Sequence, residues 1–188
     1  MSLIALIRVL ILTALAAFLP LSALAQKRPP LYYIDKGACP GECCTYRQWK
    51  TEITTRLFSH PDIHSRRVGV VHAGSTVSAL TGEVHTIPSR FVAKTSHGRY
   101  RAADVLWVYT YIGEGVFKVW FSGRMREEQL EFSPFGGSSG NRCEKSATCW
   151  GELDQELRST WWIRIRTPTG LRGWTNQGKN FSGADACS

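Results

Sequence analysis

The segment DVLWVYTYIGEGVFKVWFSGR, residues 104–124, most constrains what this 188-residue chain can fold into. Strand-forming residues alternate on both sides of Glu114-Gly115, which is the pattern of two antiparallel strands joined by a two-residue turn with glycine at positive φ. The predicted facing pairs are Ile112 with Phe117, Thr110 with Val119, and Val108 with Phe121. These six residues and Leu106 form one apolar face, and Trp107, Tyr109, Tyr111, Lys118 and Trp120 lie on the other. We expect the first face in the core and the second as an aromatic surface.

A second hairpin is predicted in STWWIRIRTPTGLRGWTN, residues 159–176, with Thr169-Gly170 in the turn and Ile165 opposite Trp174. Alternation then turns Trp161, Ile163 and Ile165 one way, with Trp161 and Trp174 in the core, and turns Trp162, Arg164 and Arg166 to the exposed side. Displayed rings beside basic groups suit a ligand with sugar or apolar faces and carboxylates or phosphates. The candidate ligand-binding residues of both hairpins are Trp107, Tyr109, Tyr111, Lys118, Trp120, Trp162, Arg164 and Arg166. Burial of the rings under residues 125–158 is the alternative to display.

The rest of the chain predicts further short strands. TEITTRLF (51–58), RRVGVV (66–71) and STVSALTGEV (75–84) are rich in strand-forming residues, and HAGS (72–75) supplies a turn. Residues 26–44 are rich in Pro, Gly and Cys, so we expect no regular structure there. The fold class expected is all-β with little helix.

Residues 1–25 predict the compartment. They carry Arg8, an apolar run, Pro20 and an Ala23-Leu24-Ala25 end, which is the layout of a secretory signal peptide cleaved after Ala25. An uncleaved membrane anchor is the alternative. With cleavage we expect a periplasmic or secreted protein without stable membrane insertion. Export argues against nucleic acid despite a net charge of +8, and favours peptidoglycan, another anionic envelope polymer or an exported protein as the partner.

Six cysteines lie after the predicted cleavage site, at Cys39, Cys43, Cys44, Cys143, Cys149 and Cys187. An even count in an oxidising compartment predicts three disulfides. We expect Cys143 to pair with Cys149, and Cys187 with Cys43 or Cys44. The alternative of a metal site is disfavoured because CPGECC lacks the paired C-x2-C spacing of zinc ribbons.

Three stretches together resemble bacterial SH3-like domains. VGVVHAGSTVSAL resembles the strand, turn and strand that begin the family pattern, and VFKVWFSGRM and WWIRIRTPTGLRGWT resemble its ending. The resemblance implies a compound SH3-like β-barrel with disulfide-bound insertions, spanning residues 45–188, that binds ligands in aromatic-lined grooves and is not catalytic. It allows two incomplete units sharing a core, about 45–124 and 125–188, or one barrel with an insertion.

The sequence indicates no catalytic group, cofactor or metal. His60 and His64 flank Pro61, which disfavours a helical metal site. The acidic residues Glu127, Glu128, Glu131, Glu152, Asp154 and Glu156 lie in charged stretches typical of solvated surfaces. We therefore predict an exported, non-catalytic binding module, with a small wall-active hydrolase as the alternative.

Overall fold

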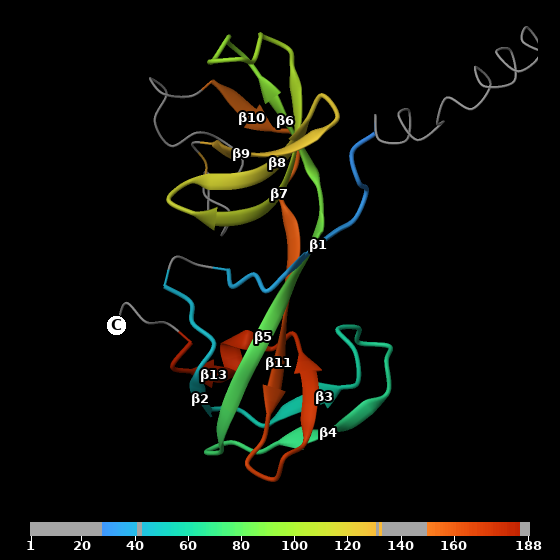
Figure 1. The fold of residues 1–188 in the computed structure, drawn as a ribbon, viewed down its shortest axis with the longest axis vertical. Helices are drawn as coiled ribbons and strands as arrows, with labels where there is room; N and C mark the ends of the chain where they lie inside the picture. Colours follow the sequence, from blue (N-terminus) through green and yellow to red (C-terminus); the bar gives the residue numbers. More distant parts are fainter. Residues whose placement is uncertain (1–27, 41–42, 131, 133–149, 185–188) are drawn as a thin grey trace, which may run out of the picture.

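The computed structural model describes residues 28–40, 43–130, 132 and 150–184, which form two antiparallel β-sheets stacked end to end (Figure 1). The only helical element among them is the 3-10 turn η2 (Gly178–Asn180). The all-β prediction is therefore confirmed. No helix in this described part is both long and apolar enough to cross a membrane, and the predicted signal peptide lies outside it.

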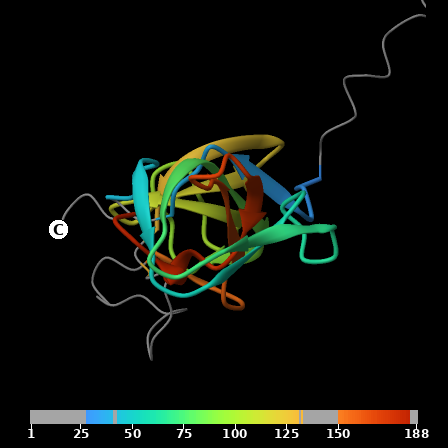
Figure 2. The same ribbon diagram turned by 90° about the horizontal axis from the view of Figure 1, so that it is seen from below.

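The first sheet is curled like half of a barrel, as the view from below shows (Figure 2). Its strands are β1 (Tyr33–Lys36), β2 (Gln48–Thr51), β3 (Thr55–Phe58), β4 (Arg67–Val71), β5 (Thr76–Ile87), β11 (Arg158–Arg166), β12 (Arg172–Thr175) and β13 (Phe181–Ser182). Their order is β13-β2-β5-β11-β12-β3-β4, and β1 pairs with the far end of β5. The core inside the curl contains Trp49, Leu57, Val71, Val77, Ala79, Ile163, Ile165 and Phe181.

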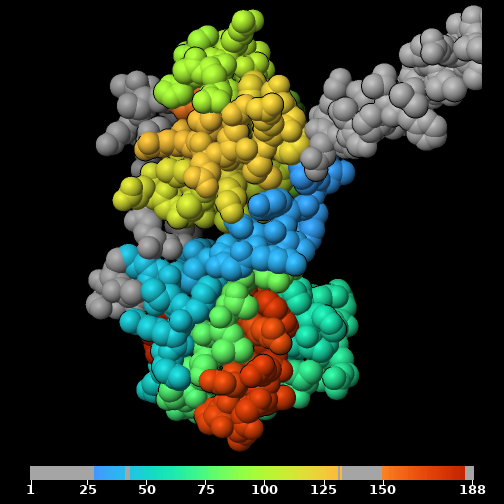
Figure 3. All heavy atoms as spheres, viewed as in Figure 1, coloured from blue at the N-terminus to red at the C-terminus, as the bar shows by residue number. Residues whose placement is uncertain are grey.

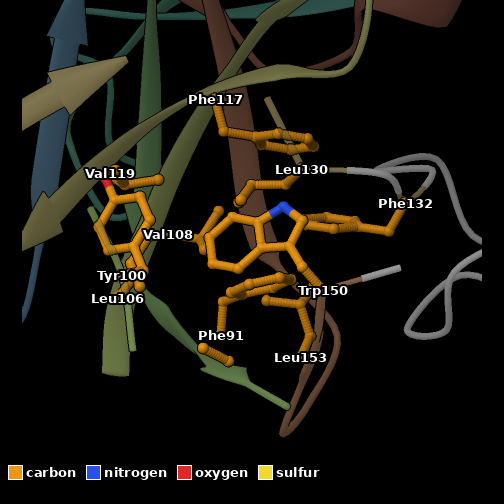
Figure 4. Close-up of a cluster of buried hydrophobic side chains, with 11 residues drawn as sticks. Phe91, Tyr100, Leu106, Val108, Phe117, Val119, Leu130, Phe132, Trp150 and Leu153 are labelled. Atoms are coloured by element: carbon orange, nitrogen blue, oxygen red, sulfur yellow. The ribbon is translucent and has the colours of Figure 1, made fainter. Parts of the chain in front are cut away.

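The second sheet has its own core (Figure 4). Its strands are β6 (Ser89–Ala93), β7 (Val105–Gly113), β8 (Val116–Phe121), β9 (Arg124–Gln129) and β10 (Gly151–Leu153), in the order β10-β6-β7-β8-β9. Trp150 lies at the centre of the core, 4.6 Å from the Phe91 ring and stacked 5.2 Å from the Tyr100 ring. Such contacts between rings stabilise a small core beyond the area they bury.

A double-stranded stem joins the two sheets. β5 continues past Pro88 into β6, while β10 leads into β11; β10 pairs with β6 and β11 pairs with β5. The second sheet is thus inserted between two neighbouring strands of the first. The division expected near residue 124 falls inside the second sheet and corresponds to no boundary between sheets. Local patterns could not show this, because the strands that pair across the stem are far apart in sequence.

The β7–β8 hairpin has the predicted turn and a different register. Glu114 and Gly115 both have positive φ, 50° and 77°, as a type I′ turn requires, and Gly113 faces Val116 as predicted. Two irregularities in the ladder then shift the pairing, so that Trp107 faces Trp120 and Val108 faces Val119. The predicted facing pairs Ile112–Phe117, Thr110–Val119 and Val108–Phe121 are therefore wrong. Of the residues predicted to face the core, Leu106, Val108, Phe117 and Val119 are nevertheless fully buried in it. Ile112 is 42% exposed, so its predicted core position is wrong.

The β11–β12 hairpin differs from its predicted register by one residue. Arg164 faces Trp174 and Ile165 faces Gly173. The Gly170 N–H donates to the Thr167 carbonyl, and the Thr167 N–H donates to the Leu171 carbonyl, so three residues form the loop, with Gly170 at φ 85°. This is the three-residue turn that ends in a left-handed glycine. Trp174 consequently lies outward beside Arg164, and its predicted core position is wrong.

The N-terminal lead forms a strand, contrary to expectation. Tyr33–Lys36 pairs antiparallel with residues 83–86 of β5. A strand of only four residues next to a stretch rich in Pro, Gly and Cys is too short to be recognised from its alternation. It can be identified only from its pairing with β5.

Disulfides are present near this strand. Cys39 is bonded to Cys44, with their Cα atoms 5.6 Å apart, and Cys43 is disulfide-bonded as well. Of the two partners predicted for Cys187, Cys44 is therefore excluded, and the pairing with Cys43 stays a prediction. Cys187, Cys143 and Cys149 lie outside the described residues.

Candidate binding surfaces

The predicted aromatic surface of the β7–β8 hairpin is covered by the N-terminal segment, which runs as a band between the two lobes (blue in Figure 3). Tyr109 is fully buried; its hydroxyl donates to the Pro30 carbonyl at 2.8 Å, and its ring lies 5.1 Å from that of Tyr33. The Lys118 ammonium binds both carboxylate oxygens of Asp35, at 2.7 and 2.8 Å. These contacts hold the two lobes together instead of leaving the surface open.

The remaining aromatic residues of this predicted surface are also poorly displayed. Trp120 is buried and Trp107 opposite it is half-buried. Tyr111 packs against the second core, 5.1 Å from the Phe117 ring, because the shifted register turns it inward. The expectation of an open platform here is wrong, and the N-terminal segment is what covers Tyr109 and Lys118. Residues 133–149, within the segment expected as the alternative cover, lie outside the described residues.

The outer face of the first sheet carries the predicted arginines. Ile163 and Ile165 are buried in the core, so the intervening Arg164 and the following Arg166 point away from it, and both are exposed. The Arg164 guanidinium lies 5.9 Å from the centre of the Trp174 ring, a cation–π contact. Arg166 faces Arg172 directly in the ladder. We call these four residues, Arg164, Arg166, Arg172 and Trp174, the arginine face.

Two directly opposed arginines are an unusual arrangement. Like charges that face each other across an antiparallel pair destabilise it. Within the described part of the chain, no carboxylate forms an ion pair with either Arg166 or Arg172. A hollow of about 550 Å³ lies beside Arg166 and is lined by the polar side chains of Gln48, Thr76, Ser78 and Thr167, with Pro168 and Gly170. Arg166 and Arg172 are therefore accessible to an anionic group of another molecule.

Trp162 lies on the outer side of β11 and is buried, so its predicted display is wrong. The Phe58 ring meets it edge-on at 6.2 Å and the His85 ring lies 6.4 Å away. Trp162 forms the floor of a groove of about 690 Å³. The groove is lined by Tyr32, by Pro61, Asp62 and Ile63 of the β3–β4 loop, by His85 and Ile87 of β5, and by Leu157–Thr160 and Asn176. We call this the tryptophan groove.

Hydrogen bonds among the side chains of Tyr32, His85 and Glu83 fix one wall of the tryptophan groove. The Tyr32 hydroxyl lies 2.5 Å from His85 Nδ1, and His85 Nε2 lies 3.0 Å from a Glu83 carboxylate oxygen. All three groups are satisfied when the hydroxyl donates to Nδ1 and Nε2–H donates to Glu83. Burial, and then the negative charges of Asp62 and Glu83, raise the pKa of the Tyr32 phenol. A phenol in its neutral form is a hydrogen-bond donor, so these hydrogen bonds fix the positions of Tyr32 and His85 in the wall of the groove.

Three of the six acidic residues named as hydrolase candidates, Glu128, Glu152 and Asp154, bind other side chains. Lys94 pairs with Glu152 at 2.6 Å and Arg90 pairs with Asp154 at 3.0 Å, both across the sheet surface. The Tyr100 hydroxyl donates to Glu128. Glu131 lies outside the described residues, which contain no cluster of three or more metal-ligating side chains. None of these carboxylates lines the tryptophan groove.

Sequence reasoning missed Tyr32, His85 and Arg172. His85 follows STVSALTGEV, and continuing the alternation of that strand places Glu83 and His85 on the same face. That signal was available, whereas Tyr32 lies in the lead that was expected to be irregular. Comparisons with protein-family models, with curated proteins and with solved structures find no match for this chain.

Proposed function

We propose that this protein is an exported, non-catalytic binding module that attaches to peptidoglycan or another anionic envelope polymer through the arginine face. The observation that carries the proposal is the facing pair Arg166 and Arg172. Their repulsion costs stability in the isolated protein, and a bound carboxylate or phosphate would remove that cost. Trp174 beside Arg164 adds a ring of the kind that packs against sugar or apolar faces.

The SH3-like assignment belongs to the same proposal. Two of the three stretches that resemble the family correspond to β4, the turn and β5, and to the β11–β12 hairpin, within the curled first sheet. The third, VFKVWFSGRM, corresponds to β8 and the start of β9 in the second sheet and lies outside that part. A strongly bent sheet around one small core is what the resemblance implies. On this reading the second sheet is a large insertion into an SH3-like barrel, and the arginine face is the outer surface of the barrel.

The test pairs binding with stability. Arg166→Glu places an acid opposite Arg172, so we expect co-sedimentation with purified peptidoglycan to fall at least tenfold while the thermal midpoint stays the same or rises. A cross-strand ion pair contributes about 0.2–1 kcal/mol, which opposes any loss from the substitution. Arg124→Glu, an exposed arginine of the second sheet, is the matched control and should bind like the wild type.

Equal binding by Arg166→Glu and the wild type, at low and at physiological salt, would refute the arginine face. Release of soluble fragments from peptidoglycan by the wild-type protein would instead favour the hydrolase. The non-catalytic proposal is supported by the ion-paired positions of Glu152 and Asp154.

A further inference from the structure

The N-terminal half of β11 has one open edge. Residues 158–166 pair with β5 along their whole length, but β12 pairs only with residues 163–166. Among the described residues, no strand pairs with the other side of 158–162. The tryptophan groove lies along this side, because Arg158, Ser159, Thr160 and Trp162 all line it. An unpaired edge beside a groove is where an added strand can bind.

The backbone N–H and C=O groups of this edge point alternately toward β5 and toward the open side. The Trp162 carbonyl oxygen lies 2.9 Å from where a Cβ on Gly82 would stand, so it faces β5. Backbone groups alternate in direction along a strand, so those of Thr160 also face β5 and those of Ser159 and Trp161 face the open side. The same alternation carries on to Ile163, which pairs with Thr175 of β12 on that side. Two N–H and two C=O groups are thus available to a partner strand.

Apolar side chains gather around the same edge. Ile63 and Ile87 line the groove while 56% and 42% exposed, and the half-exposed Tyr32 ring stands over it. Leu31 and Ile34 on either side of Tyr32 are exposed as well. Three of the eight exposed large hydrophobic residues among the described ones thus line this groove, and a fourth, Ile34, faces the groove residue His85 across the β1–β5 ladder, which is the sign of a contact surface.

Charge indicates what kind of strand fits. Arg158 is exposed at one end of the groove and forms no ion pair with any described residue, and the chain as a whole is strongly basic. The carboxylate of Asp62, which also lines the groove, accepts the His64 N–H at 2.9 Å and keeps its negative charge, so the positive charge is confined to the Arg158 end. A partner with an acidic group near Arg158 is complementary to this end.

We infer that the open edge of β11 binds an extended peptide segment of another protein by adding it as a strand. The peptide has apolar side chains at alternate positions, which enter the tryptophan groove against Ile63 and Ile87, and an acidic residue near Arg158. Main-chain hydrogen bonds to Ser159 and Trp161 supply affinity, and the groove supplies selectivity. This site shares no residue with the arginine face, although Trp162 and Arg164 are successive outward residues of β11.

The experiment selects peptides from a random seven-residue library on the whole protein and measures the affinity of a synthetic copy of the enriched sequence by fluorescence anisotropy. We expect enriched sequences with alternating apolar residues and an acid. Ile87→Ser should weaken binding at least tenfold. Ile112→Ser is the matched control, since Ile112 is also 42% exposed but lies on the second sheet, and it should change binding less than twofold.

Proline substitutions test strand addition itself. Ser159→Pro removes an N–H from the open edge and should abolish peptide binding with little change in thermal midpoint, whereas Thr160→Pro removes an N–H that faces β5 and should lower the midpoint. Arg166→Glu should leave peptide binding unchanged. Failure to enrich any peptide overturns the inference, as does an enriched peptide that binds Ser159→Pro and Ile87→Ser like the wild type. A dimer that Ser159→Pro converts to a monomer also overturns it, because the occupant would then be a second copy of this chain.

Discussion

Replacing Lys118 by methionine tests whether the N-terminal strand holds the two lobes together. The substitution keeps the length and apolar stem of the side chain and removes the charge that binds Asp35. The two contacts, at 2.7 and 2.8 Å, are charge-assisted hydrogen bonds, which contribute about 1.5–3 kcal/mol each when buried. Removing one partner of a fully buried ion pair costs about 3–5 kcal/mol, because the other charge is left uncompensated.

The exposure of this pair reduces the expected cost. The Lys118 side chain is 27% exposed and that of Asp35 is 11% exposed, so water can replace part of the lost interaction. We expect the free energy of unfolding to fall by about 2–3 kcal/mol, which corresponds to a decrease of about 5–10 °C in the thermal midpoint for a chain of this size. Urea unfolding followed by tryptophan fluorescence measures the change.

A double-mutant cycle separates this pair from a general effect of losing a lysine. Asp35→Asn combined with Lys118→Met should cost at least about 1 kcal/mol less than the sum of the two single variants. Lys50→Met is the control, since Lys50 is 61% exposed and its nearest carboxylate oxygen is 3.8 Å away. It should change stability by less than about 0.5 kcal/mol. A Lys118→Met variant as stable as the Lys50→Met control, or fully additive single variants, would refute the reasoning.

Three further predictions concern buried rings and disulfides. Trp120→Ala and Trp162→Ala should each destabilise the protein by about 3–5 kcal/mol in urea unfolding, because both residues are buried, whereas the half-buried Trp174 should cost less; a change under 1 kcal/mol for Trp162→Ala would contradict its burial. Burial, together with the hydrogen bond to Glu128 and the charge of that residue, raises the pKa of Tyr100, so above about pH 10 the unfolded chain loses this proton while the folded chain keeps it. Stability should therefore fall as pH rises beyond 10, and the fall should be shallower in Tyr100→Phe; identical profiles would contradict this. Reduction should lower stability by about 2–5 kcal/mol for each bridge lost, and alkylation without reductant should label no thiol; two or more labelled thiols would exclude three bridges.

The sequence predicted local turns better than long registers. The Glu114-Gly115 turn was predicted correctly because a glycine between two runs of strand-forming residues is the sequence pattern of a two-residue turn with positive φ. Alternation alone cannot show the irregularities between Val108 and Gly113, since an extra residue in one strand breaks the period of two without a residue type that marks it. The one-residue difference at Gly170 has a similar origin, because TPTG is compatible with loops of two or three residues.

Local sequence pattern could not predict which outward-facing residues are covered by other segments of the chain. Trp162 was assigned correctly to the outer side of its strand, but its burial depends on Phe58, on His85 and on a groove wall from residues 61–63. Tyr109 likewise faces away from the core of its own sheet and is covered by residues more than seventy positions earlier in the chain. Both cases require the tertiary arrangement, so an aromatic residue on an outward face does not by itself predict an exposed one.

The stem between the sheets has a consequence for the order of folding. Ile87 and Arg158 face each other in the first sheet, although residues 88–157 separate them in the sequence. Closing a flexible loop of that length costs about 2–3 kcal/mol more conformational entropy than closing a short hairpin loop. When β6 and β10 have already paired within the second sheet, the two ends of the loop are held together. β5 and β11 can then pair like the strands of an ordinary hairpin, without a further loop-closure cost. If the insertion folds first, the half-barrel can close on it and slow pairing of distant strands is avoided.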